Sequence, residues 1–366
     1  MKLESLARQP LKLQPNRVRR PFRGGLLLDR WQGLANPQDG FQAEEWVAST
    51  IEARNPQPVP GEGLSRVVLG DGATFTLKEA LAADPESFLG GAHFGKHGSN
   101  TAVLVKVLDS YSRLMIQVHP DRQFALKELN SDFGKTEAWY ILGGRMIDGE
   151  EPYVLLGFKP GITQEIWRDL FERQDVAGMV DALHRFPVKP GDIFLVEGGV
   201  PHAAGPGCFF MEIQEPTDYT MRVERIGPSG AMLTDDQMHQ GTDFIKMLDC
   251  FHYHGLTAGE TLSRWRLIPR LVREEAAGRV TRLLSYQDTP FFAMNLMEIG
   301  ERLEIEATGR FSVAVVLKGT GKLCWDGGEI RVGQADELFL PAALGQMIWV
   351  AESGNILEVV ECLPPL

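Results

Sequence analysis

The chain has 366 residues, of which 43% are hydrophobic and 23% are charged, and its formal net charge is −12. A chain of this length usually forms more than one packed unit, and the composition is ordinary for a globular protein. The sequence contains no run of about 18 apolar residues, so no membrane span is predicted. The negative charge disfavours nucleic acid as a partner, because it repels phosphates.

Neither the N-terminal segment nor the cysteines point to secretion. The first residues are basic, but no apolar stretch followed by a small-residue cleavage site predicts a signal peptide. The cysteines are widely spaced and form no CxxC pair; they are Cys208, Cys250, Cys324 and Cys362. Such cysteines are typical of reduced thiols. We therefore expect a soluble protein in the cytoplasm.

A helix is predicted first at residues 75–90, where Thr76 and Glu79 have the spacing of a capping box. A block of predicted strands then extends from about 100 to 255, because short runs rich in Val, Ile, Leu, Phe and Thr alternate with glycine and proline. The strand-like runs are 101–110, 114–120, 136–142, 192–199 and 208–214. Residues 162–186 interrupt this block and predict two short amphipathic helices, with Thr163 as N-cap.

A second block of predicted strands covers about 279–366. It includes 311–319, 337–342 and a hairpin over 322–332, in which an Asp-Gly pair joins two strand-like runs. Residues 263–275 are ambiguous because Pro269 interrupts a helical pattern. The segments KPGDIFLVEGGVPHA (189–203) and RVGQADELFLPAALGQ (331–346) have a similar layout. This similarity predicts one barrel unit used twice, with domains over 1–255 and 279–366 and a connecting segment over 256–278.

Four residues of metal-ligand type lie in or beside predicted strands. Gln117 and His119 are two residues apart in one strand, so their side chains point to the same face. Glu137 begins another strand, and His202 follows the tight turn EGGVP. Each could separately be an ordinary polar strand residue. Together, two imidazoles, a carboxylate and an amide oxygen favour a site for one Zn²⁺ or a similar divalent ion per chain.

The spacing of these residues also matches the two-part pattern of cupins, which are small antiparallel barrels that carry their ligands inside. In the second part, Gly191, Gly199 and His202 have this spacing, although Glu197 stands where cupins usually carry proline. In the first part, Glu137 follows a Q-x-H sequence in place of the usual H-x-H. We therefore predict a mainly β protein of two cupin-type jelly-roll barrels with a small helical insertion.

A second histidine pair, His252 and His254, is also two residues apart. No carboxylate-bearing strand motif follows it, and the rest of the chain contains no histidine, so this pair is a weaker candidate for a metal site. We expect the C-terminal barrel to lack a histidine metal site and to have a structural or lid-forming role.

At the predicted metal ligands the sequence resembles the type I mannose-6-phosphate isomerases (phosphomannose isomerases), a cupin family of zinc enzymes. The resemblance covers nearly the whole chain and is specific between about 100 and 225. The stretches that carry it are LMIQVHPD (114–121), GKTEAWYIL (134–142), VKPGDIFLVEGGVPHAAGPG (188–207) and EIQEPTDYTMRVE (212–224), with a weaker match at AEEWVAST (43–50).

The resemblance places the family's zinc ligands on the same four residues and implies three catalytic residues. Arg222 would contact the substrate, Lys135 would handle a proton near the ring oxygen, and Asp218 would act in the isomerisation step. The segment after Arg222 departs from the aromatic and acidic stretch of the family. The sequence does not identify the phosphate-binding residues.

The implied reaction is the interconversion of mannose 6-phosphate and fructose 6-phosphate through a cis-enediol. In this hypothesis Zn²⁺ polarises the sugar oxygens, Asp218 is the base, Lys135 assists ring opening, and Arg222 stabilises the oxyanion. The expected partner is a small sugar phosphate, and the chain is expected to be a monomer or a homodimer. Two alternatives stay open: a non-catalytic or differently specific sugar-binding metal cupin, and a metal-cupin dioxygenase, against which Gln117 argues.

Overall fold

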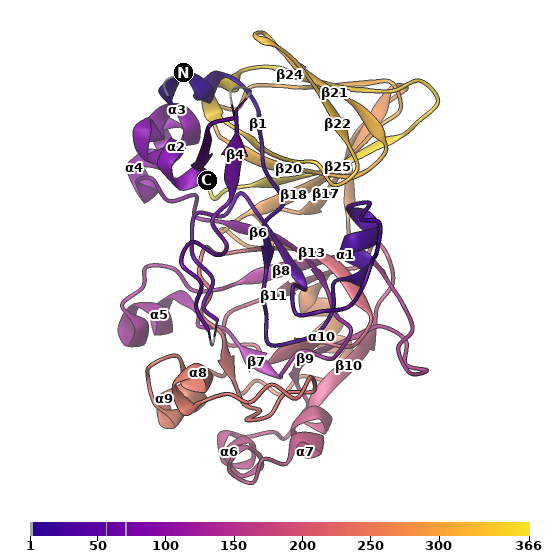
Figure 1. Cartoon of the computed structure of the whole chain (residues 1–366). Helices are drawn as coiled ribbons and strands as arrows, with labels where there is room; N and C mark the ends of the chain where they lie inside the picture. The colour runs from indigo at the N-terminus through magenta and orange to yellow at the C-terminus, as the bar shows by residue number, and fades with distance from the viewer. Residues whose placement is uncertain (1–2, 56, 70–71) are drawn as a thin grey trace.

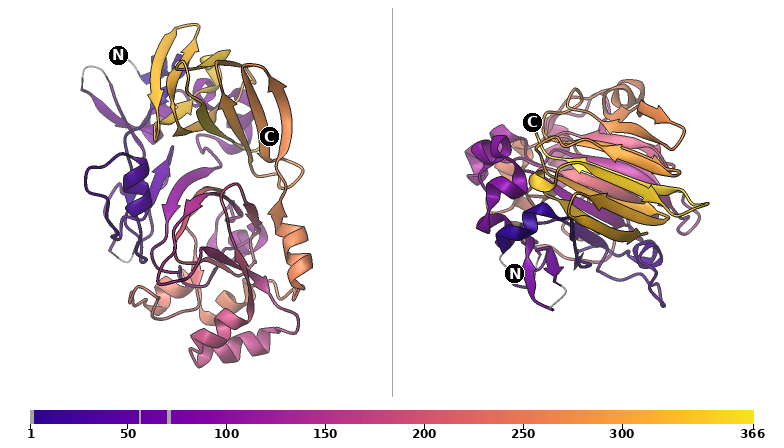
Figure 2. Two further views of the ribbon diagram at one scale, coloured as in Figure 1. Left: turned by 90° about the vertical axis from the view of Figure 1, so that its right-hand side faces the viewer. Right: turned by 90° about the horizontal axis from the view of Figure 1, so that it is seen from above.

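The computed structural model of the chain describes residues 3–55, 57–69 and 72–366, and it consists mainly of β-strands (Figure 1). Figures 1 and 2 show the strands in two stacked barrels, with the C-terminal strands, in orange and yellow, in the upper one. The prediction of a mainly β protein with two barrels is confirmed. Among the described residues, no helix has the length and apolar character needed to cross a membrane.

The first barrel consists of a seven-stranded and a five-stranded antiparallel sheet. The larger has the order β15 (Arg266–Leu267), β11 (Ile193–Val196), β8 (Glu137–Gly144), β13 (Cys208–Gln214), β6 (Leu104–Asp109), β3 (Glu44–Val47) and β2 (Arg17–Val18). The smaller has the order β10 (Leu183–Pro187), β9 (Tyr153–Phe158), β12 (His202–Ala204), β7 (Gln117–Val118) and β14 (Met221–Arg222).

The second barrel also combines two antiparallel sheets, of seven and four strands. The larger has the order β1 (Leu11–Lys12), β23 (Glu337–Leu340), β20 (Ser312–Lys318), β25 (Leu357–Leu363), β18 (Ala293–Ile299), β17 (Gly278–Leu284) and β16 (Arg270–Glu275). The smaller has the order β19 (Arg302–Ile305), β24 (Met347–Ala351), β21 (Thr320–Trp325) and β22 (Gly328–Gly333). The predicted hairpin is therefore β21–β22. A separate two-stranded sheet pairs β4 (Arg66–Val68) with β5 (Thr74–Thr76).

Short edge strands cross between the two barrels. The N-terminal β1 pairs with β23 of the second barrel, whereas β15, far along the chain, pairs with β11 of the first. The second barrel's sheet already includes β16, which begins at Arg270. The predicted domain bounds, with a first domain that ends at 255 and a second that begins at 279, stay a prediction. The edge strands show that each barrel also includes a strand from the other part of the chain.

One hydrophobic core fills the space between the two seven-stranded sheets. Met211 and Ile213 of β13 pack there together with Val313 of β20. Successive residues of a strand point to opposite faces, so Phe210 and Glu212 of β13 point into the first barrel instead. The sheet that carries the candidate site is thus covered on both faces, which holds its side chains in place.

The helices lie mostly outside the barrels. The capping box of Thr76 and Glu79 is confirmed at the start of α2 (Leu77–Ala83), and Thr163 is the N-cap of α6 (Gln164–Glu172). The helical prediction was wrong for 183–186, which belong to β10 because these residues pair with β9. The other helices are α1 (Leu26–Trp31), α3 (Pro85–Leu89), α4 (Gly91–His97), α5 (Arg122–Leu129), α7 (Val176–Asp181), α8 (Asp235–His239), α9 (Phe244–Asp249) and α10 (Ala258–Trp265), with short 3₁₀ turns at Leu3–Arg8 and Ala342–Leu344.

Candidate metal centre and active site

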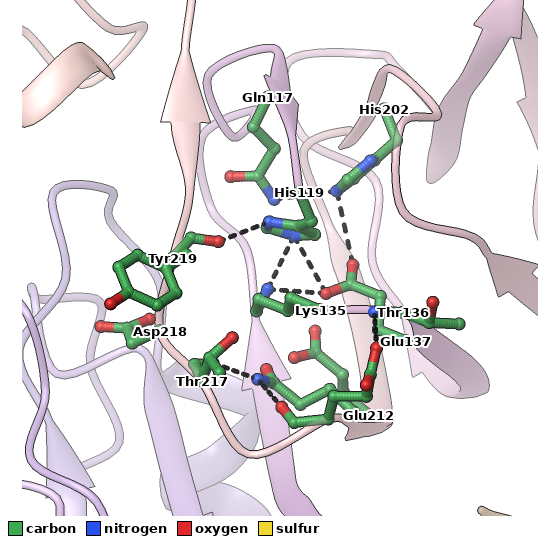
Figure 3. Close-up of polar contacts among 12 residues, drawn as sticks. Gln117, His119, Lys135, Thr136, Glu137, His202, Glu212, Thr217, Asp218 and Tyr219 are labelled. Atoms are coloured by element: carbon green, nitrogen blue, oxygen red, sulfur yellow. Dashed lines mark hydrogen bonds and ion pairs between the residues drawn. The ribbon is translucent and has the colours of Figure 1, made fainter. Parts of the chain in front are cut away.

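Three strands of the first barrel bring the predicted metal ligands together (Figure 3). His202 begins β12 and lies directly opposite Gln117 of β7. His119 follows directly after β7, and Glu137 is the first residue of β8. The structure therefore gathers all four side chains at one place inside the barrel, although Gln117 and His202 are 85 residues apart in sequence.

A glycine turn fixes the backbone before His202. Gly199 has a φ of 86°, and a Cβ on this residue would lie 2.4 Å from Nδ1 of His252, so only glycine fits here. Its N–H donates to the carbonyl oxygen of His119 over 2.8 Å. The turn therefore ties the backbone of one ligand to that of another.

The distances among the ligand atoms suit a tetrahedral cation site. Nε2 of His119 lies 3.0 Å from Oε2 of Glu137, and Nε2 of His202 lies 3.4 Å from Oε1 of Glu137. Zn²⁺ binds such atoms at about 2.0–2.2 Å, which separates neighbouring tetrahedral ligands by about 3.4 Å. The side-chain amide of Gln117 lies 3.2 Å from Nε2 of His202, and turning it over would present its oxygen at the same place. The three ionisable residues form one possible metal-binding cluster.

Hydrogen bonds outside this cluster orient both imidazoles for metal binding. Nδ1 of His119 lies 3.0 Å from the carbonyl oxygen of Tyr219, and Nδ1 of His202 lies 2.8 Å from that of Val200. A carbonyl can only accept, so each Nδ1 carries the proton and each Nε2 presents its lone pair to the cluster. Backbone carbonyls hold metal-binding histidines in many sites in this way.

The electrostatics of the cluster also favour a cation. Burial and then the charge of Lys135 lower the pKa of His119 to about 3, and burial lowers the pKa of His202, so both imidazoles are neutral. Burial opposes ionisation of Glu137, but Lys135 and His119 outweigh it and hold its pKa well below the usual value. Nζ of Lys135 lies 2.6 Å from Nε2 of His119 and 2.7 Å from Oε2 of Glu137. The lysine ammonium thus provides the positive charge among the ligand atoms, and the residues present fit a metal cation.

A small cavity of about 30 Å³ lies beside the cluster. Lys135, Gln117, Glu212 and Arg222 all line this inner cavity. Arg222 also lines an adjoining cavity of about 340 Å³. The predicted catalytic residues Lys135 and Arg222 therefore both face the cavity beside the metal ligands.

Arg222 is placed by the same strand pairing as the ligands. It lies on β14, directly opposite Gln117. The side chain is buried, and its Nη1 donates to the carbonyl oxygen of Thr220 over 3.2 Å. Burial and then the charge of Arg20 lower the pKa of Arg222 to about 10, so the guanidinium is still positive at neutral pH. Its position between two cavities suits the recognition of an anionic group.

The structure does not bring Asp218 to the inner cavity. Its two carboxylate oxygens accept hydrogen bonds from Arg20 over 2.9 and 3.0 Å, and one also accepts from the backbone N–H of Arg54 over 2.8 Å. Burial opposes ionisation of Asp218, but the charges of Arg20 and Lys106 outweigh it and hold its pKa far below the usual value. This geometry suits a residue that positions Arg20.

A different carboxyl group, Glu212, faces the inner cavity. Burial, followed by the charge of Glu137, raises the pKa of Glu212 to about 7. The indole Nε1 of Trp139 donates to its Oε2 over 3.2 Å, and Nζ of Lys106 lies 3.3 Å from its Oε1. Such a group can both take up and release a proton near neutral pH.

Sequence reasoning missed Glu212 and Lys106, although a signal for both exists. Each charged residue interrupts an apolar strand, in CFFMEIQ (208–214) and in TAVLVKVLDS (101–110). Charged side chains in the middle of buried strands need partners. The structure shows that these two are each other's partner, since they lie directly opposite on β13 and β6. His252, by contrast, lies 3.1 Å from Asp121 and away from Glu137.

Comparison with known proteins finds relatives of one kind. No protein-family model matches the chain. The chain is 28% identical over 340 residues to the probable mannose-6-phosphate isomerase GmuF of Bacillus subtilis, which covers 92% of the chain and 95% of that relative. It is 29% identical over 253 residues to the mannose-6-phosphate isomerase of Streptococcus mutans, which covers 68% of the chain and 71% of that relative.

Solved structures share the fold. The mannose 6-phosphate isomerase of Bacillus subtilis superposes with a TM-score of 0.73 at 21% identity, over 96% of this chain and 99% of that one. A variant of the phosphomannose isomerase of Salmonella typhimurium superposes with a TM-score of 0.72 at 17% identity, over 98% and 100%. The chain is thus similar over nearly its whole length to proteins named mannose-6-phosphate isomerase. The family resemblance predicted from the motifs is confirmed.

One departure from the cupin pattern has a structural reason in this chain. Glu197, which replaces the usual turn proline, accepts hydrogen bonds from Arg264 over 2.9 Å and from the indole of Trp265 over 2.9 Å. Both partners belong to α10. The glutamate therefore fastens this helix to the barrel next to the turn that carries His202.

Proposed function

We propose that this chain is a metal-dependent aldose–ketose isomerase that interconverts mannose 6-phosphate and fructose 6-phosphate through a cis-enediol. One observation carries the proposal: a cavity beside a cluster of metal ligands is lined by a carboxyl group, Glu212, whose pKa of about 7 suits proton transfer. The names of the relatives supply mannose 6-phosphate, and fructose 6-phosphate is the ketose that forms from it through a cis-enediol.

We further propose that the metal is one Zn²⁺ per chain, held by Gln117, His119, Glu137 and His202. Two imidazoles and one carboxylate are a donor set of catalytic zinc sites, and with Gln117 as the fourth donor the substrate would enter as a fifth ligand, an expansion that zinc allows. When bound, Zn²⁺ would polarise the carbonyl and hydroxyl oxygens of the sugar and stabilise the negative charge of the enediolate.

Glu212 is our choice for the group that moves the proton between the two carbons. It lines the cavity, and it is close to half ionised at neutral pH. Asp218, the base expected from the family resemblance, accepts hydrogen bonds from Arg20 on both oxygens. We therefore propose that Asp218 acts by holding Arg20 at the cavity wall.

Lys135 and Arg222 complete the proposed site. The ammonium of Lys135 lies among the ligand atoms and lines the inner cavity, so it can donate a proton to a sugar oxygen during ring opening. Arg222 lies at the junction of the inner and outer cavities. Its forked donors suit an oxyanion or a phosphate group of the substrate.

A coupled assay tests the proposal directly. The zinc-loaded chain is incubated with mannose 6-phosphate, and the formation of fructose 6-phosphate is measured. We expect turnover that depends on the metal and that disappears in Glu137→Ala. No product at high enzyme concentration, with zinc bound, would reject this substrate.

The alternative is a sugar-binding metal cupin without catalysis. The buried pair of Lys106 and Glu212 at the cavity wall argues for chemistry, because such charges are costly to bury. Under the alternative, Arg222→Ala would still bind the sugar. The wild-type chain would show no turnover that a variant could reduce. Under our proposal, Arg222→Ala removes turnover.

Location and assembly stay proposals. We propose the cytoplasm, because all four cysteines are free thiols, which fits a reducing compartment. The chain is expected to act as a monomer or a homodimer.

A further inference from the structure

The second barrel contains a cavity of about 170 Å³ that is separate from the site described above. It lies between strands β17, β18 and β25 of the large sheet and the segment around residues 305–310. Its volume is close to the roughly 150 Å³ of an engineered cavity that binds benzene. The space is therefore sufficient for a small organic molecule.

Three polar residues form a row across this cavity. Arg282 of β17 lies directly opposite Asn295 of β18, and Asn295 lies directly opposite Glu361 of β25. Residues directly opposite each other on neighbouring strands point to the same face of the sheet. All three line the cavity, and the loop before β20 adds a second guanidinium, Arg310, and a second carboxylate, Glu306.

Part of the hydrogen-bonding capacity of this row is unused within the described chain. Asn295 is only 7% exposed and Glu361 only 8%. The amide nitrogen of Asn295 donates to Oε2 of Glu361 over 3.0 Å, but its Oδ1 has no partner, and neither has Nε of Arg282. Buried polar atoms without partners are rare in proteins. A free acceptor and a free donor thus occur on two residues that line the same cavity.

The row occupies the same place as the wall of the active-site cavity in the first barrel. In the large sheet of the first barrel, β8 is followed by β13, β6 and β3. In the large sheet of the second barrel, β20 is followed by β25, β18 and β17, so these strands occupy equivalent positions. Glu212 lies directly opposite Lys106, as Glu361 lies directly opposite Asn295. The second barrel therefore carries a glutamate in the equivalent place and polar residues on the equivalent strands, although the other residues of the wall differ.

The metal ligands are not repeated in the second barrel. By the same strand pairing, Ser312 at the start of β20 corresponds to Glu137 at the start of β8. The sequence also contains no histidine after His254. The second cavity therefore has the groups to bind a molecule but not those that hold a metal in the first barrel.

We propose that the second barrel carries a non-catalytic binding site for a small polyhydroxylated anion. Arg282 and Arg310 would bind the carboxylate or phosphate group of this molecule through charge-assisted hydrogen bonds. Oδ1 of Asn295 and the carboxylate of Glu361 would accept hydrogen bonds from its hydroxyl groups. Neither guanidinium forms an ion pair with the described carboxylates that line the cavity, so a neutral sugar would leave both unpaired, and an inorganic anion would leave both acceptors unused.

Calorimetric titration of the full chain tests this site. The probes are glucuronate, which carries a carboxylate, glucose 6-phosphate, which carries a phosphate, and neutral glucose. The titrations use the Arg222→Met chain, so that binding at the first barrel is weakened. We expect one molecule of at least one of the two anions to bind per chain, and glucose to bind at least tenfold more weakly.

Variants then locate the binding. Adding Arg282→Met to the Arg222→Met chain should weaken binding of the anion at least tenfold. Arg310→Met should do the same, and it lies in a loop, so its effect does not depend on the packing of the sheet. The matched control is Arg331→Met, which removes an exposed arginine from β22 of the same barrel and should leave the affinity unchanged. Melting temperatures show that each variant is folded.

Three results would overturn the inference: no binding of either anion to the Arg222→Met chain, equal binding of glucose, or an affinity that neither Arg282→Met nor Arg310→Met changes. Binding of glucuronate alone assigns the anionic group as a carboxylate, and binding of glucose 6-phosphate alone assigns it as a phosphate. Since the titration measures binding without turnover, its outcome does not depend on whether the chain is an isomerase.

Discussion

The two barrels arrange their large sheets in the same strand order but fill their interiors differently. The first barrel buries charged side chains, among them Lys106 between Glu44 and Glu212 at 3.8 and 3.3 Å. The second barrel is filled mainly by apolar residues such as Leu303, Val359 and Trp349. The comparison shows that the fold supplies positions, whereas a few inward-facing residues decide whether a barrel can carry out chemistry.

Burying these charges is costly, and the first barrel compensates for it by pairing them. Burial alone would lower the pKa of Lys106, but Glu212 and Glu44 raise it above the usual value. The fold therefore maintains a buried cation beside a carboxyl group that titrates near neutrality. Variants that remove one charge from either barrel test how far the difference between the barrels depends on these residues.

Removal of a metal ligand should have the largest effect. Glu137→Ala takes away the carboxylate that lies close to both imidazoles. Loss of a residue that hydrogen-bonds to a metal ligand costs about 10–100-fold in metal affinity or activity. We expect zinc content and kcat/KM to fall by more than this, because Glu137 is itself a proposed ligand. Elemental analysis and the coupled assay measure both. Glu329→Ala, which removes an exposed carboxylate from the second barrel, is the control and should change neither.

Loss of the carboxyl group of Glu212 should come next. Glu212→Gln preserves the shape of the side chain but cannot take up a proton, so we expect kcat to fall by about 10²- to 10⁴-fold. Zinc content should stay at the wild-type value, because Glu212 is not among the ligands. Glu358→Gln on β25 of the second barrel serves as the matched control. A kcat within twofold of the wild type would assign the base to another residue.

The pH dependence of turnover follows from the raised pKa of Glu212. Its value of about 7, caused by burial and then by Glu137, means that the carboxyl group is mostly protonated at pH 6 and mostly ionised at pH 8. A general base acts in its ionised form, so kcat should rise with pH through about 7. The rise should be absent from the residual activity of Glu212→Gln. A flat wild-type profile from pH 6 to 8 would contradict the role of Glu212.

Disruption of the buried pair of Asp218 and Arg20 should mainly reduce stability. Asp218→Asn removes one of the two buried carboxylates that pair with Arg20, the other being Glu44, and the loss of one partner of a buried pair costs about 3–5 kcal/mol. Urea unfolding measures the change in the free energy of unfolding. Asp181→Asn, which breaks an exposed pair with Lys159, should cost about 1 kcal/mol or less. A large loss of kcat in Asp218→Asn without loss of stability would instead support Asp218 as the base.

The smallest effect is expected where the two barrels meet. Glu337 of β23 is buried, and neither of its carboxylate oxygens has a partner among the described residues. Burial followed by the charge of Glu45 raises its pKa well above 4.5. The folded chain therefore keeps a proton that the unfolded chain loses above about pH 4.5, and stability falls as the pH rises through the folded pKa. Glu337→Gln should raise the melting temperature at pH 8 relative to the wild type, with a smaller gain at pH 5. An equal change at both pH values would contradict this account.

The candidate metal ligands could be selected from the sequence because local signals mark them. Gln117 and His119 share a strand, and His202 follows a turn that needs glycine at position 199. Helix boundaries with side-chain caps, such as Thr163 before α6, were also readable, because the capping contact spans only three residues. These features depend on neighbours in the chain, so their physical causes are visible in the sequence itself.

The tertiary structure alone decided which carboxyl group faces the cavity and which is paired. Glu212 and Asp218 are six residues apart in a segment whose sequence does not show the partner of either. Arg20, nearly 200 residues earlier, binds Asp218, and strand pairing places Lys106 opposite Glu212. The pKa of a buried carboxyl group depends on burial and on charges brought close by folding. Such contacts between distant segments leave no local signal in the sequence.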